Sequence, residues 1–597
     1  MSRRLSSAAV AAALVFAACK KDAPPPPGAA VAPTTAAAPS GGAAQAAGQP
    51  AGAPAGKNPE GCNSDLSEPF VANTTFTEKC SPYTVKTELN VTGWDLTIEP
   101  GVEVRFAEGA SLSVGYGQVG RLLARGTAEK PVRFTAADRK EAGIWRGLRF
   151  FDKAEGSVLE NAAVEFAGQA EDFAVIVESG DLSFTNVSVS QVKGKAVQVK
   201  SALPFKALSG LDLTKAGGKG VALEAQIGAL GPAGLAASFA PGALVELHGD
   251  VERDVRLTNV GAAYRVTSEV SIHGETDGKT ATLTIDPGVT VEMAENAAFW
   301  VGYEQTRQGQ LKAVGTAEKP ISFRRFGDDA AQTPFRGFQF WAGARPVELD
   351  YVVIDNAGTK DHAALMFEDS HNLGKITHTT IRHSKGGAIE IRRTRERFAA
   401  FENNTFDDLG DGFGLKLPLI CAHQLAATNT FPKGSWVELD EDPLDGDVTL
   451  TPLNVPYRRF AGLTIDGAAQ GKSASLTVAA GTTVQFGNDA RVTVSYANSG
   501  KLVVQGTPAA PVNFGKVDGA WGGIVAADKA TLQLENLVID GTGDELPAIE
   551  AKATSQGSLK GITFKSGKVG VEKCSDKVTT AGLKAAPGGK AETKEGC

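Results

Sequence analysis

The chain has 597 residues, of which 42% are hydrophobic and 21% are charged, so most of it can bury a core and wholesale disorder is excluded. It contains 69 glycines and 29 prolines, too few for a collagen-like chain. The 60 Lys and Arg residues stand against 68 Asp and Glu residues, and the formal net charge of -8 argues against nucleic acid as the main partner.

Residues 1–18 have the pattern of a secretory signal peptide. Arg3 and Arg4 give it a positive start, and the apolar run after them is too short to span a bilayer as a mature helix. The run closes with Phe16-Ala-Ala-Cys19, which resembles the lipobox of bacterial lipoproteins. That resemblance implies cleavage before Cys19 and a lipid on its sulfur, so that the chain is exported and anchored to a membrane. An ordinary signal peptide followed by a chance cysteine is the alternative.

Residues 19–60 begin with that cysteine and continue as a segment rich in Ala, Pro and Gly. Such a composition cannot offset its ordering entropy by burial, so we expect a disordered tether. Lys20 follows the cysteine, and the Asp that holds some lipoproteins at the inner membrane is absent there. The resemblance therefore favours the outer membrane, with the protein on its periplasmic or cell-surface side.

Three copies of one unit make up most of the remaining chain. The run Leu96-Thr-Ile-Glu-Pro-Gly-Val-Glu-Val104 recurs as Leu283-Thr-Ile-Asp-Pro-Gly-Val-Thr-Val291 and as Leu476-Thr-Val-Ala-Ala-Gly-Thr-Thr-Val484. The glycines of these runs are 187 and 193 positions apart, so the unit is about 190 residues long. We therefore divide the chain into a first copy with an N-terminal cap, a second copy, a truncated third copy and a C-terminal cap or tail, at residues 61–260, 261–455, 456–573 and 574–597.

Each copy contains a shorter period. A Gly or Ala followed by an apolar residue recurs every 22–27 residues, as at Gly147, Ala174, Ala196 and Gly220 in the first copy. Around these points apolar and polar residues alternate, which predicts short strands, and no segment has a sustained helical period. Short strands that return at this spacing without intervening helices predict the coils of a parallel solenoid. The small residues would lie where coils stack closely, and prolines would open strands at Pro131, Pro320 and Pro511.

The Leu-Thr-Ile-x-Pro-Gly-Val-x-Val run, a Gly-x-Leu-x-Ala-x-Gly-Thr segment, Pro-Val-x-Phe-Thr and Trp-x-Gly resemble right-handed parallel β-helix proteins of the pectate-lyase-like superfamily. More narrowly, they resemble the large bacterial lipoproteins that carry such repeats. The resemblance covers residues 62–573. It implies an all-β fold, a right-handed parallel β-helix of three repeats preceded by a signal peptide and a disordered linker. At about 24 residues per coil, this stretch would form roughly 20 coils.

Five cysteines remain once Cys19 is assigned to the lipid. In an exported protein the close pairs predict disulfides that close the two ends of the solenoid, where the terminal coils lack a neighbour. These pairs are Cys62–Cys80 and Cys574–Cys597. The remaining Cys421 is expected to be a buried thiol, and the spacings match no zinc or redox motif.

The densest basic run lies in the second copy. Arg392, Arg393 and Arg395 are candidates for binding an acidic glycan, because guanidinium groups suit carboxylates and sulfates. Polysaccharide lyases of the superfamily that the chain resembles use Arg or Lys as a base, and Asp407, Asp408 and Asp411 follow nearby. No family motif matches residue by residue, so no catalytic residue is assigned. A solvated face crossed by salt bridges is the plainer interpretation.

Four of the seven histidines fall within 22 residues of the second copy: His362, His371, His378 and His383. Neighbouring coils could bring two or three of them together, but their spacing fits no metal motif, so no metal site is expected. His378 and His383 are kept as candidate ligands. Acidic loops at 438–447 and 246–254 leave calcium open although they lack the EF-hand register, and no other cofactor is expected.

All the tyrosines but Tyr351 recur in each copy. Tyr83, Tyr264 and Tyr457 lead the copies, while Tyr116, Tyr303 and Tyr496 occupy one equivalent turn. Tyrosines at that turn could stack on sugar rings, but a structural plug is the favoured interpretation because every copy repeats them.

From the sequence we expect a non-catalytic binding, scaffold or adhesin-like protein of the cell envelope that engages polysaccharide or another envelope protein. The three copies decay evenly and none has a convincing catalytic set, which motivates this expectation. A polysaccharide lyase or glycoside hydrolase acting in the second copy is the alternative. The membrane would be reached through the lipid anchor, and nucleic acid is not an expected partner.

Overall fold

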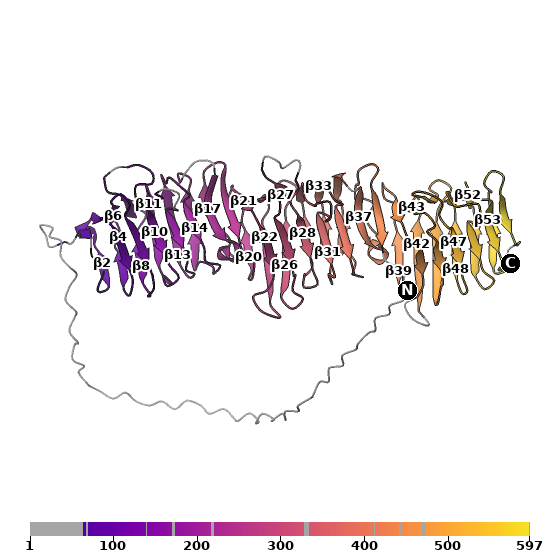
Figure 1. The fold of residues 1–597 in the computed structure, drawn as a ribbon, viewed down its shortest axis with the longest axis horizontal. Coiled ribbons are helices and arrows are strands. Elements are labelled where there is room, and N and C mark those ends of the chain that lie inside the picture. The colour runs from indigo at the N-terminus through magenta and orange to yellow at the C-terminus, as the bar shows by residue number, and fades with distance from the viewer. Residues whose placement is uncertain are drawn as a thin grey trace, which may run out of the picture. The chain divides into compact units, whose positions relative to one another are not determined.

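The computed structural model describes residues 62–597 apart from 63, 67, 69, 139, 170–172, 217–219, 328–332, 411, 441–442, 468–471 and 596. The predicted signal peptide, Cys19 and the tether therefore lie outside the described residues. The described part is an all-β, right-handed parallel β-helix of about 18 turns. Figure 1 shows its coils stacked in chain order from indigo to yellow. Among the described residues, no helix has the length and apolar character needed to cross a membrane.

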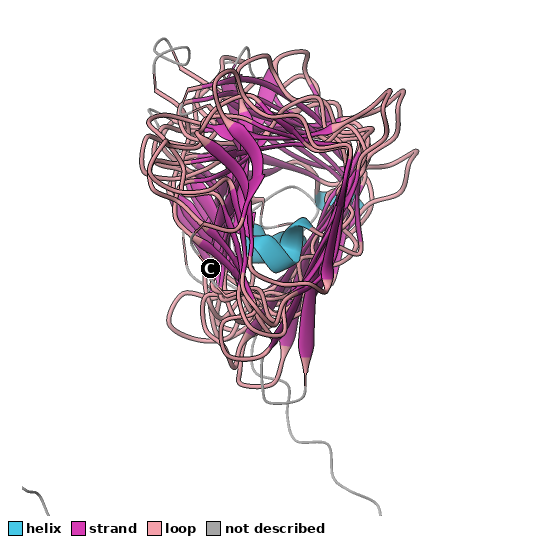
Figure 2. Ribbon diagram, turned by 90° about the vertical axis from the view of Figure 1, so that its right-hand side faces the viewer, coloured by secondary structure: helices cyan, strands magenta, loops and turns pink. Residues whose placement is uncertain are grey.

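A typical coil is built from three short strands. One coil of the first copy consists of β6 (Glu103–Phe106), β7 (Ser111–Val114) and β8 (Arg121–Arg125), and the next of β9 (Val132–Ala136), β10 (Gly147–Phe150) and β11 (Val158–Glu165). Strands at corresponding places pair in parallel, so β6 pairs with β9, β7 with β10 and β8 with β11. Residues alternate along each strand between the interior and the surface, and the strands surround an apolar interior (Figure 2).

Fewer turns form than the sequence predicts, because some coils carry long loops. In the pairing of β7 with β10, Leu112 lies opposite Leu148, whereas Val175 lies opposite Val197 in the pairing of β12 (Val175–Val177) with β14 (Val197–Val199). The first two residues are separated by more residues along the chain than the predicted coil contains, and the second two are separated by fewer. The extra residues extend outside the stacked strands and leave the pairing of the core strands intact.

Three of the predicted small residues lie where two coils stack closely. The prediction is wrong for Gly220, where an added Cβ atom would meet nothing within 4 Å. A Cβ atom on Gly147 would lie 2.2 Å from the carbonyl oxygen of Ala174, and one on Gly337 would lie 2.5 Å from that of Ala364. The equivalent Gly523 would place a Cβ 2.7 Å from the oxygen of Ala548. All three glycines also have positive φ, so the short period in the sequence records a close backbone approach. The predicted prolines directly precede strands β9, β27 (Ile321–Arg325) and β46 (Val512–Lys516).

One set of tyrosines fixes the start of each copy. Tyr264 and Tyr457 are fully buried, and their hydroxyls donate to the carbonyls of Thr258 and Thr451 at 2.8 and 3.0 Å. Tyr83 is also buried, and its hydroxyl accepts a hydrogen bond from the backbone N–H of Thr77 at 2.9 Å. In each case the partner lies six residues earlier, so the three phenols hold the same corner of the chain.

The cysteines are placed as the sequence predicts. Cys62 and Cys80 form a disulfide at the first coils with a Cα–Cα distance of 5.5 Å, and Cys574 and Cys597 form one at the last coils with a distance of 5.2 Å. Cys421 is buried in the short 3-10 helix η3 (Leu419–Ala422), where its thiol lies 3.6 Å from the carbonyl oxygen of Thr394.

Hydrogen-bonded sheets continue across both boundaries between copies. At each boundary, however, a sheet joins strands that occupy different positions in their coils. Counting from the turn at Gly101, Gly288 or Gly481, the first strands of the coils include β6, β24 (Thr290–Met293) and β43 (Thr483–Phe486). The second strands include β7, β25 (Ala298–Val301) and β44 (Val492–Val494). A 13-stranded sheet joins second strands of the first copy to first strands of the second copy. A 12-stranded sheet joins second strands of the second copy to first strands of the third.

Each copy is therefore rotated about the solenoid by one side of the coil relative to the copy before it. The joining pairs are β19 (Ala243–His248) with β21 (Ala263–Val266), and β38 (Trp436–Asp440) with β40 (Tyr457–Arg459). Because a coil has three sides, equivalent strands of the three copies lie on three different sides.

Candidate functional site

An open groove lies on the surface of the second copy. It crosses the ends of four adjacent parallel strands, β27, β30 (Val352–Asp355), β33 (Thr380–Ser384) and β36 (Thr405–Leu409), and has a volume of about 530 Å³. Its lining is mostly charged and polar: Arg324, Arg325, Asp355, Asn356, His383, Ser384, Lys385, Asp408 and Gly410. These residues come from four successive coils, so only the stacking of coils brings them together.

A row of left-handed residues shapes the groove. Asn356, His383 and Asp408 have φ angles of 63°, 55° and 46°, and the strand register makes them neighbours from coil to coil. Asn and Asp tolerate this conformation better than most residues, which explains two of the three positions. The bend breaks the alternation of the strand at the same point in each coil, and the groove lies along this row.

His383 and Asp355 form the central contact of the groove. The Nδ1 atom of His383 lies 2.7 Å from Oδ1 of Asp355, and Nη2 of Arg382 donates to the other carboxylate oxygen at 2.7 Å. Burial on its own would raise the pKa of Asp355, but hydrogen bonds from His383 and Arg382, with their charges, hold this pKa below its usual value. When the imidazole is neutral, an ionised Asp355 favours the tautomer with the proton on Nδ1, so that Nε2 is the acceptor nitrogen.

The cations of the groove belong to a longer row of alternating charges on the same sheet. Arg324 donates to Glu292 at 2.9 Å, and Glu292 also binds Arg265 at 2.7 Å. At the rim, Arg325 donates from Nε to the carbonyl oxygen of Thr333 at 2.9 Å. The charges are thus fixed in place by their neighbours, and rigid charges lose little conformational entropy when a ligand binds.

The predicted arginine run lies on another side of the coil and serves mainly as a partner of acids. Arg392, the last residue of β34 (Ile389–Arg392), donates to Glu390 at 2.8 Å, and Arg393 contacts Glu368. Both glutamates are buried, with side chains 7% and 8% exposed, so the guanidinium groups offset carboxylates that would otherwise be costly to bury. Arg395 contacts Asp445, whose side chain is only partly buried. The glycan-binding role of Arg392, Arg393 and Arg395 stays a prediction.

Only His383 of the four clustered histidines lines the groove. His378 stacks on Tyr351 with 4.4 Å between ring centres, and its Nδ1 lies 2.8 Å from Asp350. Burial and then the charge of Arg336 lower the pKa of His362, whose Nδ1 is buried without a partner among the described residues. His371 is exposed. These four histidines form no group of three potential ligands in the described part of the chain, and the role of His378 and His383 in metal binding stays a prediction.

Two of the acids predicted as calcium candidates form ion pairs with basic residues, and residues 441 and 442 lie outside the described part of the chain. Lys416 lies 3.4 Å from Glu438, and Arg307 lies 3.2 Å from Glu252. Glu246 of the acidic loop 246–254 also forms a cluster with Glu224 and His248, which no sequence motif indicates, and the ligand atoms of the three lie within 4.8 Å of one another. Lys195 and Gln198 already donate to Glu224 at 2.9 and 2.8 Å, so this carboxylate is satisfied without an ion.

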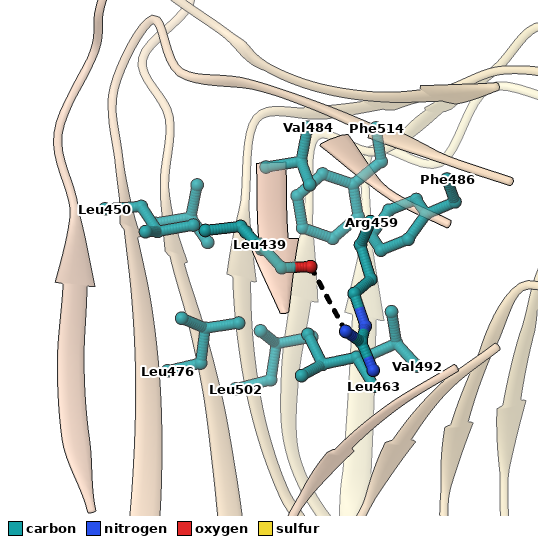
Figure 3. Close-up of a pocket in the computed structure, with 11 residues that line it drawn as sticks. Leu439, Leu450, Arg459, Leu463, Leu476, Val484, Phe486, Val492, Leu502 and Phe514 are labelled. Carbon is teal, nitrogen blue, oxygen red and sulfur yellow. Dashed lines mark hydrogen bonds between the residues drawn. The ribbon is translucent and has the colours of Figure 1, made fainter. Parts of the chain in front are cut away.

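A second cavity lies in the interior of the solenoid (Figure 3). Its volume is about 10 Å³, room for about one water molecule at most, and its walls are apolar except for Arg459. Arg459 is 6% exposed and donates from Nη1 to the carbonyl oxygen of Leu439 at 3.1 Å and from Nε to that of Gly462 at 3.0 Å. Val266 occupies the equivalent interior position in the second copy. This cavity is too small for a ligand, which leaves the surface groove as the candidate site.

The chain matches no protein-family model, and no curated protein is significantly similar to it.

Proposed function

We propose that this chain is an envelope protein whose β-helix binds an acidic polysaccharide without cleaving it. The observation that carries the proposal is the open groove of the second copy, where Arg324, Arg325 and Lys385 accompany the imidazole of His383. Guanidinium and ammonium groups bind carboxylates and sulfates through charge-assisted hydrogen bonds. Asp355 and Asp408 in the same groove supply acceptors for hydroxyl groups, which suits a ligand that is both anionic and rich in hydroxyls.

The sequence of the amino-terminal segment suggests where in the cell this binding takes place. The lipobox-like Phe16-Ala-Ala-Cys19 and the tether at residues 19–60 would attach the β-helix to the outer membrane, as in the β-helix lipoproteins of the pectate-lyase-like superfamily that the repeats resemble. Cys19→Ser is expected to move the protein from the membrane fraction to the soluble fraction after cell lysis. Retention of this variant in the membrane fraction would contradict lipidation.

The His383–Asp355 pair favours one alternative, a polysaccharide lyase. Asp355 orients the imidazole so that Nε2 could take the proton next to a uronate carboxylate, while an arginine neutralises that carboxylate. The electrons of the broken C–H bond would form a double bond and expel the glycosidic oxygen, which would take the proton back from the imidazolium of His383 or from water. This requires no group beyond those that line the groove.

The two functions are separated by following polymer mass. We would mix the protein with alginate, polygalacturonate and dextran and measure mass by size-exclusion light scattering. We expect the mass of at least one acidic polymer to rise without shortening, and Lys385→Ala and His383→Ala to weaken this binding several-fold. Lys312→Ala, a lysine paired with Glu348 at 3.2 Å on another sheet, is the matched control. A falling mass that His383→Ala prevents would establish the lyase, and no change with any polymer would contradict both functions.

A further inference from the structure

The second set of tyrosines is exposed in every copy. The exposed fractions of Tyr116, Tyr303 and Tyr496 are 64%, 54% and 82%. The interpretation of these residues as structural plugs is therefore wrong, because a plug must be buried, as Tyr83, Tyr264 and Tyr457 are. The three copies differ at many other positions, yet each has a solvent-exposed tyrosine at this turn.

The turn that carries these rings has the same backbone in each copy. The residue before the tyrosine is left-handed at Gly115, Gly302 and Ser495, with φ angles of 74°, 62° and 63°. In the third copy a serine adopts this conformation, which costs a non-glycine residue free energy. The turn geometry is thus kept even where glycine has been lost.

Other aromatic rings surround the tyrosine in two of the copies. Tyr116 meets Phe151 edge to face, with 4.9 Å between ring centres. Tyr303 lies 5.2 Å from Trp341 and 5.3 Å from Trp300, so the second copy presents three neighbouring rings. Phe151 and Trp341 are equivalent, because each follows the strand that begins at Gly147 or Gly337.

The ring cluster of the second copy contains polar donors without acceptors. The indole Nε1 atoms of Trp300 and Trp341 are buried and have no hydrogen-bond partner among the described residues, and the same holds for Nε2 of Gln339, which lies opposite Trp300 in the sheet. By contrast, the buried Trp145 and Trp521 each donate to a backbone carbonyl at 2.8 Å. A buried donor without an acceptor is unfavourable, and a small rotation of an indole toward a bound acceptor would remove part of that cost.

We propose that these three turns are stacking sites for the pyranose rings of a polysaccharide, with the strongest site at Tyr303, Trp341 and Trp300. The C–H face of a sugar ring packs on exposed aromatic rings, and its hydroxyl oxygens accept from the indole N–H groups. This inference rests on the proposed polysaccharide binding but uses a surface distinct from the charged groove.

The rotation between copies gives the three sites different directions. The turn joins the second strand of a coil to the third, and equivalent strands of the copies lie on three different sides. Tyr116, Tyr303 and Tyr496 therefore lie at three different corners of the coil. One straight polymer running along a single side cannot reach all three, so the protein binds separate chains and links them.

Tyrosine-to-alanine variants of the full chain test the stacking sites with the same three polymers. Binding is measured by calorimetry and by intrinsic tryptophan fluorescence, to which Trp300 and Trp341 contribute two of the six tryptophans. We expect Tyr303→Ala to weaken binding about three- to tenfold and to reduce the fluorescence change, on the scale of a stacked aromatic pair. Phe460→Ala, at an exposed aromatic residue away from these turns, is the control. A triple variant at Tyr116, Tyr303 and Tyr496 that binds every polymer as the wild type does would overturn the inference, and so would a wild type that binds none.

Light scattering of mixtures with long polymers tests the linking of chains. The wild type should form networks, and the triple variant should bind at most single chains through the groove. Networks that persist in the triple variant would contradict the three-corner arrangement. The groove variants His383→Ala and Lys385→Ala separate the two proposals: if they abolish binding and the tyrosine variants do not, only the groove binds, and the reverse result leaves only the stacking sites.

Discussion

Tyr264 shows how one side chain fixes the beginning of a copy. Its ring is buried, and mainly for that reason the pKa of Tyr264 rises to about 12, although the hydrogen bond to Thr258 acts in the opposite direction. An unfolded tyrosine ionises near pH 10. Between about pH 10 and 12 the unfolded chain therefore loses this proton while the folded chain keeps it, and the free energy of unfolding falls as pH rises.

Tyr264→Phe is expected to lower the free energy of unfolding near neutral pH by about 1 kcal/mol, because the carbonyl of Thr258 loses its donor. Above pH 10 the variant should lose less stability than the wild type, by an amount on the order of 2 kcal/mol. Urea unfolding at pH 8 and pH 11.5 measures both effects. Tyr496→Phe alters an exposed ring and is the control. Equal pH slopes for Tyr264→Phe and the wild type would contradict the prediction.

At the scale of the strand, the glycine that begins β28 (Gly337–Phe340) combines two constraints. Its φ angle of 102° strains any other residue, and an added Cβ would lie 2.5 Å from the oxygen of Ala364. Gly337→Ala should therefore destabilise the second copy by several kcal/mol, seen as faster hydrogen exchange in β28 and in β31 (Leu365–Glu368).

Substitutions at two other glycines distinguish the effect of backbone strain from the effect of a steric contact between coils. Gly434 has a φ angle of 90° but open space around its Cβ direction, so Gly434→Ala should cost about 1–2 kcal/mol. Gly515 has neither constraint, and Gly515→Ala should have little effect. If Gly337→Ala cost no more than Gly434→Ala, the close approach of coils would not matter.

The sequence is sufficient to predict that coils form, but not how each copy is rotated relative to the copy before it. The alternation in Val197-Gln-Val-Lys places side chains inside or outside, and it has the same form on all three sides of a coil. The rotation at each boundary depends on which strand pairs with which across about 20 residues, and no local pattern encodes that choice. The contact of His383 with Asp355 was missed for the same reason. The aromatic residues around Tyr303 could have been predicted from the sequence, because alignment of the copies matches Trp341 with Phe151.

Across the whole solenoid, stability passes between neighbouring coils, so the ends are the weakest part. The disulfide of Cys574 and Cys597 holds the last strands, β53 (Val569–Lys573), β54 (Val578–Ala581) and β55 (Lys590–Thr593). Changing both cysteines to serine should cost about 2–4 kcal/mol, with faster hydrogen exchange confined to these strands. Cys421→Ala, in the middle of the chain, is the comparison. Loss of protection along the entire solenoid would show that it unfolds as one cooperative unit.

The change of side at each boundary also constrains how such a protein can grow. If one whole copy were deleted or duplicated, every later copy would turn by one side, and its surface would face a new direction even though its sequence and its own coils were unchanged. After three such rotations the pattern returns to its starting direction, as along a three-fold screw axis. A fourth copy would therefore present its turn at the corner where Tyr116 lies, which adds a second site in one direction and no new direction.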